Sequence, residues 1–452
     1  MSQDVRAQFK SWLESGEARL QPLTLPQREL WENSPVAVAD PGNHICGILE
    51  IKGPLTHEQC LTALQGVVAR HEALRITFLP GKDRPLQMIR ATGTAALGFH
   101  ELAAGEDLEE LIQETYRQPL DLLQGPLHRV RLIRRGVNNH VLAFCFHHAI
   151  ADGWSLGVFT QDLCTAYVMG LSGLKKAVAV GVMGLKNSLP PVVQTYTEWA
   201  AAERALWNPT LLAERAEFWR SHLAGSSRIW NDVPEPAPLE RWVTGIPPDL
   251  IAGIRGLAKD HSTTLFSTLL AAFQITLSKW TGKDDILVGT PVANRNKEAA
   301  RDTMGYYAGV VPLRGKVDPT LSFSDHLRQV AESTLDSFAN AMPYAELAAA
   351  VAETCGAGVH SIFDVRFALQ NHPVPDVSMP SISTKVRMRS TGTARFDLAC
   401  ELTEIGNELE VVWLYKPFRF TAETIGGLND LFLAVLRSAC KNPAGRAEAL
   451  IV

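Results

Sequence analysis

Residues 147–153 read His-His-Ala-Ile-Ala-Asp-Gly and directly follow the apolar run Val141–Phe146. This run is apolar at every position, which predicts a central strand covered on both faces. Successive side chains of a strand point to opposite faces, so His147 and His148 cannot both face one cleft if the strand continues to its end. Because a neutral imidazole accepts a proton near pH 7, we expect one histidine to be a base and the other a packed structural residue. Two core histidines satisfied by backbone groups are the structural alternative.

The acid and the glycine that close this stretch have several possible roles. Asp152 could orient a histidine, cap the helix that we expect to begin near Trp154, or pair with an arginine that fixes the loop. We favour the structural roles, because a stretch of loop separates Asp152 from His148. Gly153 could supply a backbone conformation or a space that a Cβ would block. The N-terminus of the following helix would add a partial positive charge that helps an oxyanion.

Composition narrows the class of protein. The chain has 452 residues, of which 46% are hydrophobic and 20% charged, and its net charge is -5. This length predicts two domains or two lobes, and this charge suggests neither nucleic acid nor an anionic membrane as the main partner. We expect a cytoplasmic monomer without a signal peptide or membrane span. The cysteines are scattered and unpaired in spacing, which favours reduced thiols and no zinc site; they are Cys46, Cys60, Cys145, Cys164, Cys355, Cys400 and Cys440.

Hydrophobic periodicity predicts helices and strands mixed in both halves, without a simple βαβ alternation. The fold class is therefore α/β with mixed sheets. The expected helices are 57–73, 108–118, one from about 154, 196–223, 265–280, 325–341 and 422–440. The expected strands are 74–79, 128–134, 139–148, 286–292, 364–369, 384–388, 396–404 and 408–415. Two further segments, 87–89 and 97–101, are expected as edge strands.

A change in residue composition divides the chain into two parts. Small residues and lysines alternate from Met169 until Pro190 and Pro191 close the stretch. We predict an N-terminal lobe over 1–175, a connection over 176–192 and a C-terminal lobe over 193–452. The polar segment 2–18 is either a short partner-docking helix or a frayed lead-in, and with Met1 it favours a free-standing protein.

The pattern HHxxxDG resembles that of the condensation domains of nonribosomal peptide synthetases and of their wider acyltransferase superfamily. Five further segments resemble motifs of these domains in the same order, so the resemblance covers nearly the whole chain. They are LTLPQRELW at 23–31, RHEALRITF at 70–78, YTEWA at 196–200, GTPVANR at 289–295 and RFDL at 395–398. Two segments depart from the family: 305–310 lacks the usual Asn and Thr, and 341–346 retains little of a histidine-rich motif. Both belong to the second lobe by position, where acceptor or interface contacts could differ.

This resemblance implies two chloramphenicol-acetyltransferase-like lobes that form a V-shaped pseudo-dimer around a tunnel. His148 would be the base near the midpoint of the tunnel, within the motif that His147, Asp152 and Gly153 complete. Structural support would come from an arginine paired with Asp152, first Arg295 and otherwise Arg75. The candidates for the tunnel wall are Trp154, Ser155 and Trp199, although plain helix packing explains Trp199 equally well.

The resemblance also implies a reaction. A carrier protein would present an acyl or peptidyl thioester on its phosphopantetheine arm, and a small-molecule or carrier-bound amine or hydroxyl would attack it. No bound cofactor and no metal is implied. The chain carries no adenylation signature and no carrier-type serine motif, so the carrier would be a separate protein. Two alternatives stay open: a coenzyme A-dependent acyltransferase of the same superfamily, and a non-catalytic protein that recruits partners.

Overall fold

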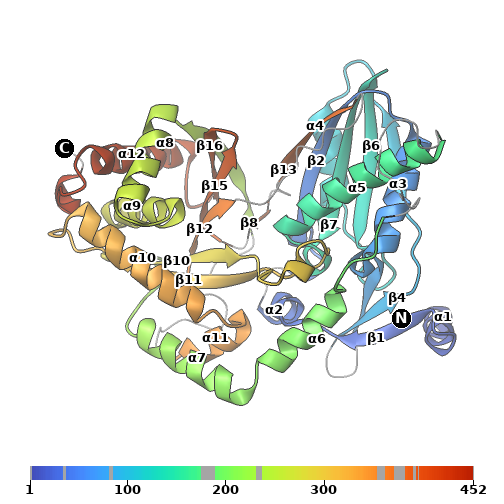
Figure 1. The fold of residues 1–452 in the computed structure, drawn as a ribbon, viewed down its shortest axis with the longest axis horizontal. Helices are drawn as coiled ribbons and strands as arrows, with labels where there is room; N and C mark the ends of the chain where they lie inside the picture. The colour runs from blue at the N-terminus through green and yellow to red at the C-terminus, as the bar shows by residue number, and fades with distance from the viewer. Residues whose placement is uncertain are drawn as a thin grey trace.

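The computed structural model has two lobes that are joined at one end and separate toward the other (Figure 1). Most of the predicted connection 176–192 lies outside the described residues, as do Arg395 and Cys355. The boundaries predicted for the two lobes therefore stay a prediction. The structure describes residues 3–33, 37–80, 85–174, 189–230, 237–353, 362–370, 382–389, 393–394 and 396–450.

The N-terminal lobe is built on a five-stranded mixed sheet in the order β13-β2-β7-β6-β5. As predicted, β7 is central, and eight of its nine residues are buried. The helices α3 and α5 pack against each other over this sheet, while α4 contacts β6 and β7. The bounds are β2 His44–Lys52, α3 His57–Arg70, β5 Leu97–Glu101, α4 Leu108–Arg117, β6 His128–Gly136, β7 Asn139–His147, α5 Gly153–Leu174 and β13 Ser383–Arg389.

A three-stranded sheet, β1-β4-β3, lies beside this lobe. The prediction that 87–89 forms an edge strand was wrong, because β4 pairs with β1 on one side and with β3 on the other. The expected strand 74–79 begins later, because a 3₁₀ turn occupies Glu72–Arg75. The bounds are α1 Gln3–Glu14, β1 Ala18–Pro22, α2 Leu25–Asn33, β3 Ile76–Leu79 and β4 Leu86–Arg90.

The C-terminal lobe has a six-stranded mixed sheet in the order β11-β10-β12-β15-β16-β9. The helix α9 is buried along most of its length and contacts α8, α10 and α12. A short pair of strands, β8 and β14, adds a two-stranded ribbon. The bounds are β8 Ala237–Pro238, β9 Glu240–Ile246, α8 Pro248–Asp260, α9 Leu265–Thr281, β10 Asp285–Val292, β11 Gly309–Lys316, α10 Phe323–Ala339, α11 Tyr344–Val351, β12 Val365–Gln370, β14 Thr393–Ala394, β15 Leu398–Ile405, β16 Glu408–Tyr415 and α12 Ala422–Lys441.

The single long helix expected over 196–223 was wrong, because the chain forms two helices there. These are α6, Tyr196–Leu206, and α7, Pro209–His222. Asn208 caps α7 by accepting a hydrogen bond from the backbone N–H of Leu211, and Pro209 occupies its first turn. Proline has no backbone N–H and clashes with the preceding turn, so a helix ends before it and a new one begins.

Segments that follow the predicted connection 176–192 complete the N-terminal lobe. The strand β13 pairs with β2 along its full length, from Ser383 opposite Lys52 to Arg389 opposite Cys46. From α6, Tyr196 belongs to the N-terminal core. These two segments, far apart in sequence, therefore hold the lobes together.

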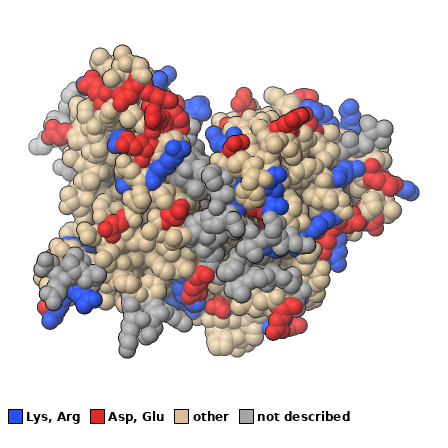
Figure 2. Space-filling model, turned by 180° about the vertical axis from the view of Figure 1, so that it is seen from behind, with Lys and Arg blue, Asp and Glu red and all other residues tan. Residues whose placement is uncertain are grey.

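Charged side chains of both signs are interspersed over both lobes on the face shown in Figure 2. In the part of the chain that the structure describes, no helix has the length and apolarity needed to cross a membrane.

Candidate active site

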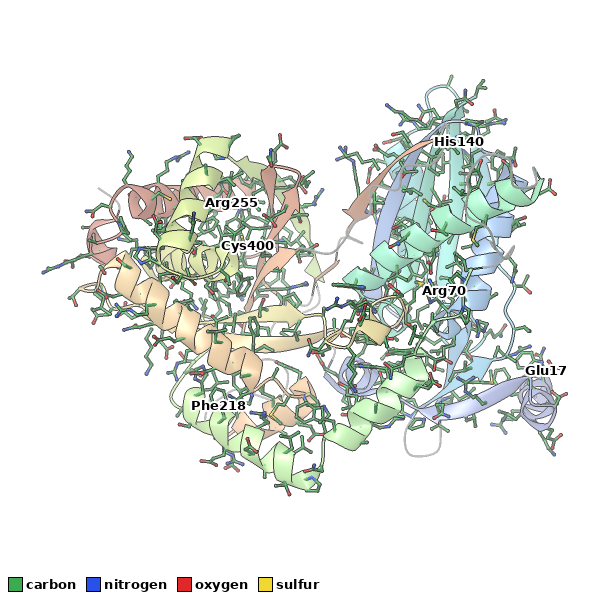
Figure 3. The ribbon with its side chains drawn as sticks, in the orientation of Figure 1. Glu17, Arg70, His140, Phe218, Arg255 and Cys400 are labelled. Carbon is green, nitrogen blue, oxygen red and sulfur yellow. The ribbon has the colours of Figure 1, made fainter. Side chains whose placement is uncertain are left out.

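The site is built where β7 ends. The strand stops at His147, a 3₁₀ turn covers His148–Ile150, and α5 begins at Gly153. His140, labelled in Figure 3, marks the hairpin end of β7, so the paired histidines lie at the opposite end of the strand. The backbone leaves the strand between the two histidines, which separates the directions of their side chains.

His147 is a fixed, fully buried side chain. Its Nδ1 accepts a hydrogen bond from the backbone N–H of Ala149, at 3.1 Å. Its Nε2 lies 2.7 Å from the carbonyl oxygen of Val38, which can only accept, so the ring is the neutral tautomer with its proton on Nε2. Both ring nitrogens therefore hold backbone in place, which is the structural role predicted for one of the two histidines.

His148 is only half buried, so its ring can be reached from outside the core. The ring packs edge-on against Tyr306, with 4.5 Å between the ring centroids and 61° between the planes. Tyr306 is itself buried and fixes one side of the imidazole. Of the two histidines, His148 is thus the one that a reactant can approach.

Asp152 is buried and receives hydrogen bonds on both carboxylate oxygens. Its Oδ1 accepts from the backbone N–H and the hydroxyl of Ser155, each at 2.8 Å, and its Oδ2 accepts from the backbone N–H of Tyr307 at 3.1 Å. The hydrogen bond from the backbone N–H of Ser155 caps the N-terminus of α5. Burial by itself raises the pKa of Asp152, but the charge of Arg295 and these hydrogen bonds outweigh it and lower the pKa below its ordinary value.

Arg295 pairs with Asp152, as predicted, at 3.0 Å between Nη2 and Oδ1. The guanidinium is 4% exposed and also donates to the carbonyl oxygens of Ala300 and Thr303, each at 2.6 Å. It lies 3.9 Å from the ring centroid of Tyr307. Arg295 therefore joins the turn after β7 to a loop of the C-terminal lobe.

That loop, residues 293–308 between β10 and β11, is called the bridging loop below. The indole N–H of Trp154 donates to the carbonyl oxygen of Arg301 at 2.8 Å. The hydroxyl of Tyr196 donates to the carbonyl oxygen of Tyr306 at 2.8 Å. These two hydrogen bonds attach the bridging loop to the N-terminal lobe. They also hold Tyr306 against the ring of His148.

Arg75 was the second candidate for the arginine that pairs with Asp152, and this prediction was wrong. Its guanidinium donates to the carbonyl oxygens of Val68, Ala69 and Arg90. Val68 and Ala69 are in the last turn of α3, whose carbonyl groups have no partner within the helix. Arg75 therefore caps α3 instead of pairing with Asp152.

The tunnel-wall candidates take different places. Ser155 is fully buried, and its hydroxyl donates a hydrogen bond to Asp152. Trp199 is buried in the core, where it stacks on Tyr196 at 5.8 Å and contacts Tyr307 at 4.3 Å. Both residues therefore have packing roles, and their assignment to a tunnel wall stays a prediction. Trp154 is half buried and ties the bridging loop.

Gly153 is the first residue of α5, and its φ is not positive. Of the two roles expected for it, an unusual backbone conformation is therefore wrong. The need for space at this position stays a prediction.

Sequence reasoning missed the contribution of the segment 305–308. It was assigned to the second lobe, yet Tyr306 and Tyr307 belong to the core of the N-terminal lobe, and only at Gly309 does β11 begin. The signal was present in the two adjacent aromatic residues after Gly305. The prediction for this segment considered only that the family's usual Asn and Thr are missing.

Gln27 is a second fixed contact near the site. Its side-chain amide donates to the carbonyl oxygen of Ala149 at 2.9 Å, and it is fully buried. Gln27, from the segment 23–31, therefore has a structural role behind the turn. The arrangement thus offers one accessible imidazole, a rigid turn behind it and the N-terminus of α5, with its partial positive charge, beside it. Within the described residues, no three His, Cys, Asp or Glu side chains gather into a possible metal site.

The chain belongs to the Condensation domain family, whose profile matches residues 17–450. It is similar to a linear gramicidin synthase of Brevibacillus parabrevis, at 29% identity over 441 residues, which is 93% of this chain and 8% of that protein. It is also similar to the phosphinothricin tripeptide synthetase PhsC of Streptomyces viridochromogenes, at 29% identity over 448 residues, which is 95% of this chain and 40% of that protein. The chain thus spans less than half the length of these relatives.

Among solved structures, the chain is similar in fold to the SgcC5 protein from Streptomyces globisporus. The TM-score is 0.79 at 23% identity, and the match covers 94% of this chain and 100% of that one. The family and the two-lobe fold with mixed sheets, both predicted from the motifs, are therefore confirmed.

Proposed function

We propose that this protein transfers an acyl or peptidyl group from a carrier-protein thioester to an amine or a hydroxyl, forming an amide or an ester. The observation that carries the proposal is the half-buried His148, presented by a braced turn in a chain of the Condensation domain family. His147, Asp152 and Arg295 support it by fixing the turn on both sides.

In the proposed reaction, His148 accepts or positions the proton of the nucleophile while the nucleophile attacks the thioester carbonyl. The new C–N or C–O bond forms first, and the tetrahedral intermediate then expels the thiolate as the C–S bond breaks. The proton that His148 holds passes to the thiolate. The partial positive charge at the N-terminus of α5 would favour the oxyanion of the intermediate.

The partners follow from the same proposal. A separate acyl or peptidyl carrier protein supplies the donor on its phosphopantetheine, and the acceptor is a small molecule or is itself carrier-bound. The proposal includes no bound cofactor, and the tunnel, a cytoplasmic location and a monomeric state stay predictions.

The test is a mass-spectrometric assay in which acyl-carrier thioester and candidate amines or alcohols are incubated with the protein. We expect His148→Ala to lower product formation by about 10²–10⁴-fold, the usual contribution of a general acid–base group. His261→Ala, an exposed histidine at the end of α8, is the matched control and should retain full activity.

Two outcomes would favour the alternatives. Acyl transfer from coenzyme A as fast as from the carrier indicates the coenzyme A-dependent acyltransferase. Binding of a carrier or of another protein without any transfer indicates the recruiting protein. A folded His148→Ala variant that turns over like the wild type would contradict the proposal.

A further inference from the structure

A cavity of ≈ 60 Å³ lies between elements of both lobes: α2, α6, the neighbouring strands β10 and β11, and the start of α11. A water needs about 10–15 Å³ of such volume, so the cavity can hold a polar group of a few heavy atoms. Its wall includes Gly309, Val310 and Met342, which lie in the two segments that depart from the family motifs. The cavity is therefore formed in part by segments of this chain that differ from the family motifs.

Two buried polar atoms in the wall have no partner. They are Oε2 of Glu203 and Nε1 of Trp207, neither of which makes a hydrogen bond to a described residue. Glu203 lies in the last turn of α6 and Trp207 directly follows the helix, four residues later, so both lie on the same side of its end. Leaving a buried polar group without a partner is unfavourable. A bound hydrogen-bond donor would partner Oε2 of Glu203, whereas the indole N–H of Trp207, itself a donor, would need an acceptor.

The charges of the wall favour a cation. Glu29 from α2 and Glu203 from α6 contribute carboxyl groups, and Tyr344 from α11 is the other titratable group. Among the described lining residues there is no Lys, Arg or His, and β10 and β11 contribute no titratable group. Arg204, which follows Glu203, donates to the carbonyl oxygen of Leu23. The indole ring of Trp207 adds an aromatic surface, which attracts cations.

We propose that this cavity binds a small organic cation, a primary ammonium group, with Glu203 as its counterion and Trp207 as its aromatic wall. The bridging loop links the cavity to the candidate active site. Asn294 lines the cavity, and its side-chain amide donates to the carbonyl oxygen of Tyr307 at 3.0 Å, next to the Tyr306 that packs on His148. Resting on the proposed function, the inference names an acceptor class: nucleophiles that carry an additional amino group.

The binding is coupled to ionisation of Glu203. Burial raises the pKa of Glu203 to about 8, and the charge of Arg204 offsets this only in part. The empty site is therefore mostly protonated at pH 7, and an ammonium group binds as Glu203 releases its proton to the solvent. The apparent affinity should rise about tenfold from pH 6 to pH 7 and level off above pH 8, where the carboxylate is already ionised.

The experiment follows the indole N–H signal of Trp207 by NMR in the full-length protein, with Trp207→Phe used to assign it. Ethylammonium chloride is the probe, and 1-propanol is its neutral counterpart. We expect the signal to shift with ethylammonium and not with 1-propanol. Glu203→Gln, which preserves shape, should weaken the binding at least tenfold, whereas Glu214→Gln, an exposed acid on α7, should leave it unchanged.

A second measurement connects the site to the reaction. The assay compares two acceptors that differ by one additional amino group, and KM should favour the amino compound in the wild type but not in Glu203→Gln. The NMR measurement needs no turnover, so a failure of the proposed function leaves the cation site testable. No shift with ethylammonium, an equal shift with 1-propanol, or unchanged binding in Glu203→Gln would each overturn the proposal.

Discussion

At the scale of single residues, two adjacent histidines differ because the strand ends between them. His147 is the last residue of β7, and both its ring nitrogens are bonded to backbone. His148 starts a 3₁₀ turn and remains accessible. Alternation along a strand could predict that they differ, and the family motif indicated which one is accessible. The contact of Tyr306 could not be predicted, because it comes from a loop more than 150 residues away in sequence.

The ion pair between Asp152 and Arg295 gives a prediction at this scale. Removing one partner of a buried pair leaves an uncompensated charge, so Asp152→Asn should lower the free energy of unfolding by about 3–5 kcal/mol at pH 7. The measurement is urea unfolding, and Asp260→Asn, an exposed acid on α8, is the control expected to change little.

The pH dependence of this difference has a definite sign. The folded pKa of Asp152 lies below its ordinary value of 3.8, so the carboxylate stabilises the fold above that value. The contribution is lost as the pH falls through the folded pKa. The difference between wild type and Asp152→Asn should therefore be constant at neutral pH and shrink as the pH falls below 3.8. A difference that grew on acidification would contradict the assigned ionisation.

At the scale of elements, helices and strands with a strong local pattern could be predicted from the sequence, whereas pairing between distant strands could not. The strands β7 and β16 and the helices α9 and α12 have strong periodicity and were expected close to their observed bounds. The break between α6 and α7 carried a local signal, Asn208 followed by Pro209, that outweighs the continuous apolar pattern. The pairing of β13 with β2 had no such signal, because it joins residues more than 330 positions apart.

The bridging loop gives the prediction for this scale. A Cβ on Gly305 would overlap the ring of Tyr196, and that ring is held by its hydroxyl between Thr24 and the carbonyl oxygen of Tyr306. Gly305→Ala should therefore cost about 1–3 kcal/mol, the usual penalty of overpacking, and should also lower activity by moving Tyr306 away from His148.

Gly256→Ala is the matched control for this change. Gly256 lies inside α8, and nothing lies within 4 Å of where its Cβ would be. Alanine in a helix interior should stabilise the protein by about 0.5–1 kcal/mol. Thermal unfolding and the condensation assay measure both variants. A Gly305→Ala protein as stable and active as the wild type would show that the loop seating does not matter.

At the scale of the whole molecule, the described residues that connect the two lobes include β13, α6 and the bridging loop. The candidate active site uses two of them, since Tyr306 comes from the bridging loop and Tyr196 of α6 fixes it. The site thus depends on the relation between the lobes and not on one lobe alone. The mixed topology was predictable from the pattern of elements. The presence of two lobes was predictable from the chain length. Their arrangement relative to each other was predictable only from the resemblance, because composition and periodicity do not specify how two cores join.

The last prediction concerns the donor, because a protein of this size can recognise more than the reacting atoms. If a carrier docks on the molecule, part of the recognition energy comes from its surface, and the thioester is delivered at high effective concentration. We expect kcat/KM for one acyl group to be at least tenfold higher on a carrier than on coenzyme A or a short pantetheine thioester, which corresponds to about 1.4 kcal/mol or more. Each donor is measured in parallel with His148→Ala, which subtracts uncatalysed transfer. Equal values for all three donors would contradict carrier docking and favour the coenzyme A-dependent alternative.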